Sequence, residues 1–296
     1  QRREERLQDV PVSVTALSSE ALQSRRILNA SDLASVTPNL QSVSTVGSST
    51  PIFALRGISM SDYSLNQASP VATYFDEVYK GNFALLGVAL YDLDRVEVLR
   101  GPQGTLYGKN TTGGAVNLIA RRPGFVSEAN LSAGYGNFNR YEATGSLQIP
   151  VSDTLAARMA FTYANANGDV RNLSVGQSDL GAVDEYGIRL SLLFQPSDSA
   201  EFILRLSTSL QDSANYGIIA EPGPNGIGGG VYATFNAIDA TFNPLTDDFR
   251  IGLGRRELTS DFTPHRRNRT YAAALTSRFD LSDSLSLISV SSYDHG

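Results

Sequence analysis

The sequence predicts a compact α+β domain followed by antiparallel strands of a membrane-spanning β-barrel, and three observations support this prediction. Up to about Pro123 the chain mixes short helical and strand patterns, whereas from Glu128 onward apolar and polar residues alternate with the period of a strand. The 296 residues include 26 glycines, 13 tyrosines and 13 phenylalanines, a composition typical of strands, turns and aromatic surfaces. Finally, the connections between the predicted strands of the second half are alternately short and long.

Composition excludes several classes of function. The chain has no cysteine and only two histidines, His265 and His295, so we expect neither a metal site nor a bound cofactor. A formal net charge of -6 argues against nucleic acid as a partner, because proteins that bind it are basic. The longest apolar run, residues 83–90, has eight residues, whereas a membrane-spanning helix needs about 18. Residues 1–6 are mostly charged and do not form a secretory signal.

The first half, residues 1–125, is predicted to form the α+β domain. Residues 10–15 alternate as a short strand does, and residues 18–23 contain a capped helix start. A second helix is expected from the N-cap residue Ser31 to Val36, because Pro38 disfavours helix at the residue before it. Further strands are expected at residues 52–56, 71–75, 95–99 and 115–120.

The second half, residues 126–296, is predicted to contain about seven strands of 9 to 11 residues. In the clearest strand the apolar residues Leu155, Ala157, Met159, Phe161 and Tyr163 share one side. The opposite side carries Thr154, Arg158 and Thr162. The same split recurs in residues 186–194 and 202–210, and more weakly in residues 129–135, 141–149, 271–281 and 285–293.

Two environments produce such alternation: a soluble sandwich or barrel with its apolar face inward, or a membrane barrel with that face towards lipid. The connections near residues 150–153, 195–198 and 282–284 are tight, whereas residues 165–184 and 211–268 form long ones. In outer-membrane barrels the periplasmic turns are short and the extracellular loops long. The pattern therefore favours an antiparallel transmembrane β-barrel in the outer membrane of a Gram-negative bacterium.

Residues 94–119 form the most specific motif of the chain. A strand ends at Gly101 and Pro102, the chain is expected to turn at Gly104 and Gly108, and a second strand follows Gly113 and Gly114, where side chains would clash. A phosphate-binding P-loop is the competing interpretation. It requires four residues between its glycines and Ser or Thr after its lysine, whereas here three residues separate the glycines and Asn110 follows the lysine.

This segment resembles the central plug motif of TonB-dependent receptors. The matching positions are Glu97, Gly101, Pro102, Gly104, Tyr107, Gly108, Gly113 and Gly114. Other stretches resemble the same family in the same order. Residues 10–15 are similar to the strand after the TonB box, residues 33–40 to a helix ending in a Pro-Asn-Leu turn, residues 53–58 to a second plug signature, and residues 71–81 to the hairpin before a ligand-facing loop.

The resemblance implies a plug domain inside a barrel of about 22 strands, of which about seven predicted strands would be an incomplete part that cannot close. It implies a transporter rather than an enzyme. The implied partners are TonB with the ExbB/ExbD energy system, outer-membrane lipid, and an extracellular ligand such as a ferric siderophore. Oligosaccharide or cobalamin uptake, and signal transduction by the same architecture, remain alternatives.

The resemblance also implies roles for individual residues. Arg56 and Arg100 match family arginines that form an ionic lock with glutamates on the barrel wall, which would lie on strands after residue 296. Ligand contacts are expected at the plug apices and in the long loop, where aromatic side chains would either stack on an organic ligand or pack among themselves. The candidates are Tyr63, Asn82, Phe83, Tyr216, Tyr232 and Phe235.

Overall fold

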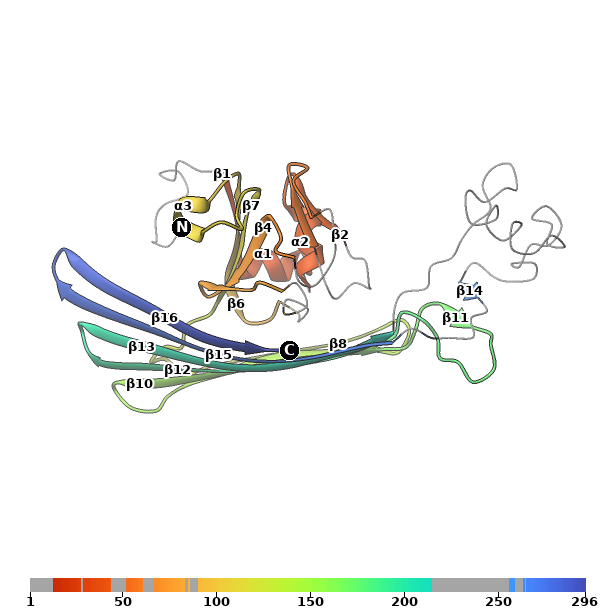
Figure 1. Cartoon of the computed structure of the whole chain (residues 1–296). Helices are drawn as coiled ribbons and strands as arrows, with labels where there is room; N and C mark the ends of the chain where they lie inside the picture. Colours follow the sequence, from red (N-terminus) through yellow and green to blue (C-terminus); the bar gives the residue numbers. More distant parts are fainter. Residues whose placement is uncertain are drawn as a thin grey trace.

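A computed structural model shows a curved antiparallel sheet with a smaller α+β domain on its concave side (Figure 1). It describes residues 13–27, 29–43, 52–60, 67–82, 85, 90–214, 256–258, 263 and 265–296. In Figure 1 the small domain is orange to yellow, and the large sheet runs from green to blue. None of the helices in these ranges is long and apolar enough to cross a membrane.

The small domain is built on a mixed sheet that, in the described residues, has the strand order β1-β6-β7-β4-β5. These strands are β1 (Ser13–Ser18), β4 (Val71–Phe75), β5 (Val78–Tyr79), β6 (Leu93–Arg100) and β7 (Gly114–Ala120). β4 and β7 pair in parallel, and the other neighbours are antiparallel. A separate hairpin pairs β2 (Leu40–Val43) with β3 (Ile52–Leu55), of which β2 was not predicted.

Helices cover this sheet: α1 (Ser19–Ser24), the 3-10 turn η1 (Ala30–Asp32), α2 (Leu33–Val36) and α3 (Gly104–Tyr107). The Ser18 hydroxyl accepts a hydrogen bond from the Ala21 amide and caps α1. The expected N-cap at Ser31 is wrong. Asn29 caps the turn instead, because its side chain accepts from the Asp32 amide (3.1 Å) while Asp32 accepts from the Asn29 amide (3.0 Å), a capping box.

The large sheet contains, within the described ranges, the seven predicted strands in the order β16-β15-β13-β12-β10-β9-β8. They are β8 (Glu128–Gly136), β9 (Arg140–Pro150), β10 (Leu155–Ala166), β12 (Val183–Ser197), β13 (Ala200–Ala214), β15 (His265–Ser282) and β16 (Leu285–His295). A two-residue parallel pair, β11 (Arg171–Asn172) with β14 (Glu257–Leu258), joins the two long connections.

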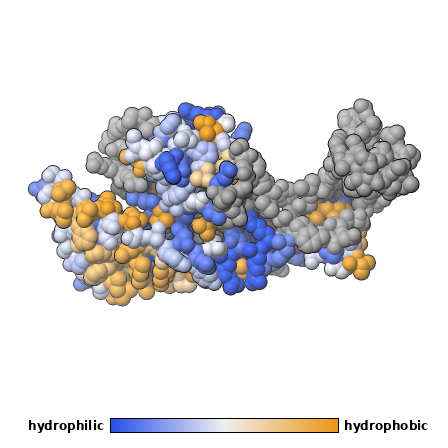
Figure 2. Space-filling model, viewed as in Figure 1, coloured by the Kyte–Doolittle hydropathy of each residue, from blue (hydrophilic) through white to orange (hydrophobic). Residues whose placement is uncertain are grey.

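The expected strand length of 9 to 11 residues is right for β8, β9 and β16 and wrong for the other four strands, since β10 has 12 residues, β12 and β13 have 15 and β15 has 18. At about 3.4 Å per residue an 18-residue strand is about 60 Å long, twice the thickness of a hydrocarbon core. Figure 2 shows apolar residues gathered at the end of the sheet with the short turns, and hydrophilic residues nearer the long connections. The strands therefore continue beyond the lipid on the long-loop side.

The predicted alternation holds along the central strands. On the convex face Met159, Leu190 and Leu206 are 48%, 37% and 43% exposed. The neighbouring residue of each strand points to the concave face instead. These residues, Arg158, Ser191 and Arg205, are 2%, 2% and 8% exposed. An apolar outer face and a covered polar inner face are the arrangement of a membrane barrel, and the opposite of a soluble sandwich.

Aromatic residues border the apolar band at both ends. Tyr163 pairs across strands with Tyr186 near the long connections, and Phe202 lies 6.1 Å from Phe194 and 5.4 Å from Phe279 between ring centroids near the short turns. From Tyr186 to Phe194 the strand rises about 26 Å, or about 20 Å across a membrane for a tilt near 40°. This spacing agrees with the apolar band of outer-membrane barrels, about 25 Å tall.

A lysine in the middle of this band is expected to destabilise the barrel strongly. Leu190→Lys should lower the free energy of unfolding by about 2 to 4 kcal/mol, because the ammonium group would face hydrocarbon. Leu281→Lys, at the end of β15 beside a short turn, is the matched control and should change it by about 1 kcal/mol or less. Urea unfolding in lipid vesicles measures both, and equal effects would contradict the assigned lipid face.

Candidate functional site

The glycine motif forms the connection between β6 and β7. Gly101, Gly108 and Gly114 have φ angles of 93°, 87° and 148°, which side-chain-bearing residues rarely adopt. A Cβ atom on Gly114 would lie 2.3 Å from the Leu99 carbonyl oxygen, and one on Gly113 would lie 3.0 Å from Ile58 Cγ2. Close packing of the backbone therefore requires glycine at position 114, whereas at position 113 a Cβ atom would press only on the Ile58 and Val71 side chains.

The turn expected at Gly104 is wrong. Gly104 begins the short helix α3, its φ is not positive, and a Cβ atom there would meet nothing within 4 Å. Tyr107, at the other end of α3, is buried: its hydroxyl accepts from Asn117 Nδ2 (2.8 Å) and its carbonyl accepts from the Tyr74 hydroxyl. Glu97 is also buried and accepts from Arg95 Nε at 2.8 Å. Pro102 is the second residue after the end of β6 at Arg100.

Arg56 and Arg100 lie near each other at the ends of two plug strands. Arg56 is exposed, and its Nη1 atom is 4.0 Å from the position of a Cβ atom on Gly101. Arg100 donates from Nη2 to Thr15, while its Nε atom is buried without a hydrogen-bond partner in the described structure. The glutamates expected to pair with them would lie after residue 296, so their role stays a prediction.

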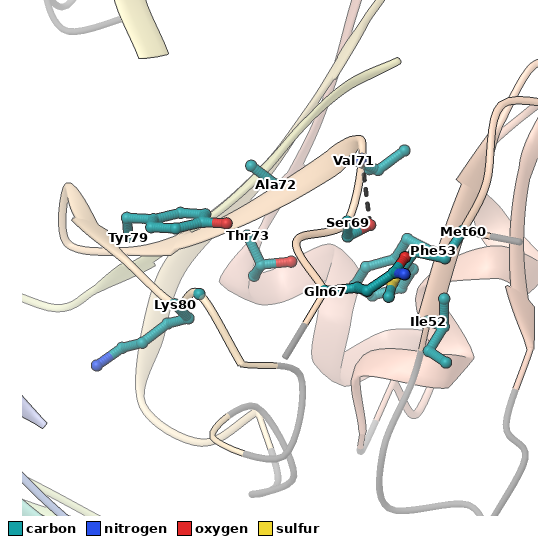
Figure 3. Close-up of a pocket in the computed structure, with 11 residues that line it drawn as sticks. Ile52, Phe53, Met60, Gln67, Ser69, Val71, Ala72, Thr73, Tyr79 and Lys80 are labelled. Atoms are coloured by element: carbon teal, nitrogen blue, oxygen red, sulfur yellow. Dashed lines mark hydrogen bonds between the residues drawn. The ribbon is translucent and has the colours of Figure 1, made fainter. Parts of the chain in front are cut away.

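Of the ligand-contact candidates, Asn82 lies within the described residues, where its carbonyl accepts from the Leu85 amide (3.0 Å). Tyr63, Phe83, Tyr216, Tyr232 and Phe235 lie outside them. A cleft beside the expected plug apex is lined by Met60, Gln67, Ser69 and Thr73 among others (Figure 3). Its volume of about 20 Å³ suits a single water molecule rather than an organic ligand.

The contact between the plug and the curved sheet depends on residues that sequence reasoning did not select. Arg158, Arg189 and Arg205 occupy concave-face positions of β10, β12 and β13 and are 2%, 6% and 8% exposed. A buried guanidinium requires partners, because leaving a charge unpaired away from water is costly. An arginine at an inward-facing position of three neighbouring strands was the signal available in the sequence.

Arg158 makes the best-aligned of these contacts. Its Nε atom donates to Asp92 Oδ2 (2.8 Å) and its Nη2 atom to Asp92 Oδ1 (2.5 Å), a bidentate pair with the plug. Its Nη1 atom donates to Gln148 Oε1 (3.1 Å) and Glu128 Oε2 (3.3 Å) on the wall. The plug and two wall strands therefore share this one side chain.

Arg205 forms a second ion pair with the plug. Its Nε atom lies 3.2 Å from Asp76 Oδ2, although the two are not aligned as a hydrogen bond, and Asp76 Oδ1 accepts from the Ala120 amide (2.9 Å). Burial raises the pKa of the Asp76 carboxyl above its usual value, whereas Arg205 and Arg189 act in the opposite direction. This pair therefore orients the plug more than it stabilises it.

Arg189 has a different environment, because no carboxylate of the described residues lies within ion-pair distance of it. Its guanidinium carbon is 4.5 Å from the ring centroids of both Phe75 and Tyr91, and its Nη1 atom donates to the Tyr91 carbonyl (3.3 Å). Two aromatic faces and one carbonyl oxygen from the plug thus enclose the cation.

These contacts lie in two adjacent rows of the wall. Arg158 is in register with Ser191, which is in register with Arg205, and Arg189 belongs to the adjacent row two residues along β12. Two further ion pairs, Lys80 with Asp294 of β16 and Arg121 with Glu128 of β8 (3.2 Å), extend the same zone to both edges of the sheet. We call the wall residues Glu128, Arg158, Arg189, Arg205 and Asp294 the docking belt.

A plug held by a docking belt inside a curved membrane sheet defines a plugged outer-membrane β-barrel protein. The TonB-dependent Receptor Plug Domain family matches residues 6–115. Residues 6–115 therefore form a TonB-dependent receptor plug domain, and the chain as a whole is similar to the plug and the N-terminal part of the barrel of outer-membrane TonB-dependent receptors of Gram-negative bacteria.

Individual relatives agree with this assignment. The chain is 29% identical over 188 residues to the pesticin receptor of Yersinia pestis, a match that covers 63% of the chain and 28% of that receptor. It is 30% identical over 136 residues to the ferrioxamine receptor of Yersinia enterocolitica, covering 46% and 18%. The matched segments therefore span less than a third of the length of these relatives.

Solved structures show the same fold. The ferric yersiniabactin uptake receptor of Yersinia pestis superposes with a TM-score of 0.78 at 22% identity, covering 96% of this chain and 40% of that one. The siderophore receptor PiuA of Acinetobacter baumannii superposes with a TM-score of 0.71 at 16% identity, covering 97% and 37%.

Proposed function

We propose that the chain is the gated part of a receptor that binds an extracellular iron–siderophore complex and imports it into the periplasm with energy from TonB and ExbB/ExbD. Residues 1–125 act as the plug and residues 126–296 as the first part of the wall. The observation that carries the proposal is the buried contact between Arg158 of the wall and Asp92 of the plug. A plug anchored across the lumen blocks the path of a ligand, so uptake requires an energy-dependent displacement.

Two further observations support the proposal. Relatives of this chain are named for ferrioxamine and ferric pyoverdine, which are iron complexes of siderophores. The buried Nε atom of Arg100, which has no hydrogen-bond partner among the described residues, is available to a wall glutamate on a later strand, the ionic lock proposed for Arg56 and Arg100. The aromatic ligand-contact candidates would then lie on the extracellular side of the plug.

Uptake of radioactive iron tests this function. A receptor in which this chain continues into a closed barrel would be expressed in a Gram-negative strain without ferric siderophore receptors of its own. Ferrioxamine and ferric yersiniabactin are the probes, since these are the ligands for which two relatives are named. We expect uptake of at least one of them that disappears when TonB is deleted. Uptake that persists without TonB would contradict the proposed energy coupling.

A matched variant separates transport from binding. Deleting the segment that precedes residues 10–15, which resemble the strand after the TonB box, should abolish uptake while cell-surface binding of the same complex persists. A receptor that neither binds nor imports either iron complex, but imports an oligosaccharide or cobalamin in a TonB-dependent way, would contradict the proposed iron ligand. The alternative ligand class would then take its place.

A further inference from the structure

We propose that Arg158, Arg189 and Arg205 form a binding site for an anionic ligand on the barrel wall, covered by the plug at rest and uncovered when the plug moves. This inference rests on the proposed function, because it requires the plug to leave the wall during uptake. It adds a second ligand-binding site, on the wall, to the contacts expected at the plug apices. It also predicts that the imported complex is an anion with several carboxylate or phenolate groups.

The geometry concentrates positive charge on the middle of the described wall. Arg158 and Arg205 lie in register two strands apart, a separation of about 10 Å between Cα atoms. Arg189, on the strand between them and two residues along, is about 8 Å from each. An anion that carries several acidic groups could therefore contact all three side chains at once.

The plug supplies most of the acceptors that these arginines now use. Asp92 pairs with Arg158, Asp76 pairs with Arg205, and the Tyr91 carbonyl accepts from Arg189. All three acceptors leave with the plug. Guanidinium groups do not lose their protons in proteins, so the wall cannot remove the charge by titration. A new anion is then the partner that this surface requires.

The acidic residues of the docking belt lie at its two edges. Glu128 of β8 stays within reach of Arg158, and Asp294 of β16 loses Lys80 when the plug leaves. The belt therefore carries three positive and two negative groups, with the positive ones adjacent on β10, β12 and β13. A further ion pair between the two halves, Arg122 with Glu201 of β13, leaves a carboxylate four residues along the strand from Arg205. An anion is therefore attracted to the level of the three arginines, and repelled from the edges and from the short-turn end of β13.

Conductance measurements on the receptor with a complete barrel test the proposal. The receptor is placed in a planar lipid bilayer under a potassium chloride gradient, and urea is added at concentrations that unfold the plug while the barrel strands stay paired. We expect the chloride-to-potassium permeability ratio to exceed unity, because charged groups that line a pore select ions of opposite sign. Citrate, a tricarboxylate, is expected to reduce the chloride current by occupying the three arginines.

A charge exchange separates ligand binding from plug docking. The quadruple variant R158D/D92R/R205D/D76R keeps each pair in the closed state but leaves carboxylates on the wall after opening. Arginine fits the left-handed backbone of Asp92 (φ 49°) and Asp76 (φ 46°), since Arg26 and Arg56 of this chain have φ angles of 51° and 52°. We expect a permeability ratio below unity and no citrate block. An unchanged ratio would overturn the proposal and leave the arginines a docking role only.

Single substitutions keep the test valid if that variant fails to fold. Arg189→Gln removes a positive charge without breaking an ion pair, and should weaken citrate block about tenfold, the loss expected for one charged hydrogen bond. Arg189→Lys retains the charge and should preserve most of the block. Equal citrate block of the chloride current in the two variants would contradict the proposed site. Conductance needs neither TonB nor a siderophore, so failure of the proposed uptake and failure of this site are distinguishable.

Discussion

Replacing Arg158 by alanine is expected to detach the plug from the wall more than any other single change in the docking belt. The substitution leaves the Asp92 carboxylate, whose side chain is 10% exposed, without its bidentate partner. Breaking one side of a buried ion pair typically destabilises a protein by about 3 to 5 kcal/mol. We expect the plug strands to lose a corresponding amount of hydrogen-exchange protection in the receptor with a complete barrel, while the wall strands keep theirs.

Two variants control for this result. Arg278→Ala removes a wall arginine that is 52% exposed and pairs with Asp280 of its own strand, so protection of the plug should stay within about 1 kcal/mol of wild type. Adding Asp92→Asn to the Arg158→Ala variant removes the unpaired carboxylate and should restore part of the stability. If Arg158→Ala behaved like Arg278→Ala, the docking belt would not hold the plug.

Replacing Gly114 by alanine is expected to unfold the central sheet of the plug. The new Cβ atom would lie 2.3 Å from the Leu99 carbonyl oxygen and 2.7 Å from Leu55 Cδ1, in a backbone with φ 148°. The first neighbour is backbone and cannot rotate away, so β6 and β7 would have to separate. Overpacking and backbone strain together should lower the free energy of unfolding of the plug by about 4 kcal/mol.

Gly104→Ala is the matched control for that experiment. It lies in the same motif, has open space around its Cβ position and sits in α3, where alanine is the better helix former by about 1 kcal/mol. Thermal unfolding of the plug, monitored by limited proteolysis, should show a large loss of stability for Gly114→Ala and none for Gly104→Ala. Similar losses in both variants would show that the motif is selected for something other than close packing.

Local chemistry explains why much of the fold was predictable. The strand-period alternation of Met159, Leu190 and Leu206 determined which face meets lipid, since each side chain points away from its neighbours along the strand. Ser18 and Pro38 marked a helix start and a helix end by effects confined to a few residues. Where two caps competed, Asn29 prevailed over Ser31 because Asp32 could reciprocate its hydrogen bond.

The sequence by itself determined the seven strands, the face of the sheet that points outward and the family that the chain resembles. It did not determine which charged residues meet across the interface. Arg158 and Asp92 are 66 residues apart, one in β10 of the wall and the other just before β6 of the plug, so their pairing depends on how the plug is seated against the register of the wall. Only the tertiary structure brings the arginines of β10, β12 and β13 under Asp76, Tyr91 and Asp92, because contacts between distant segments follow from packing rather than from local pattern.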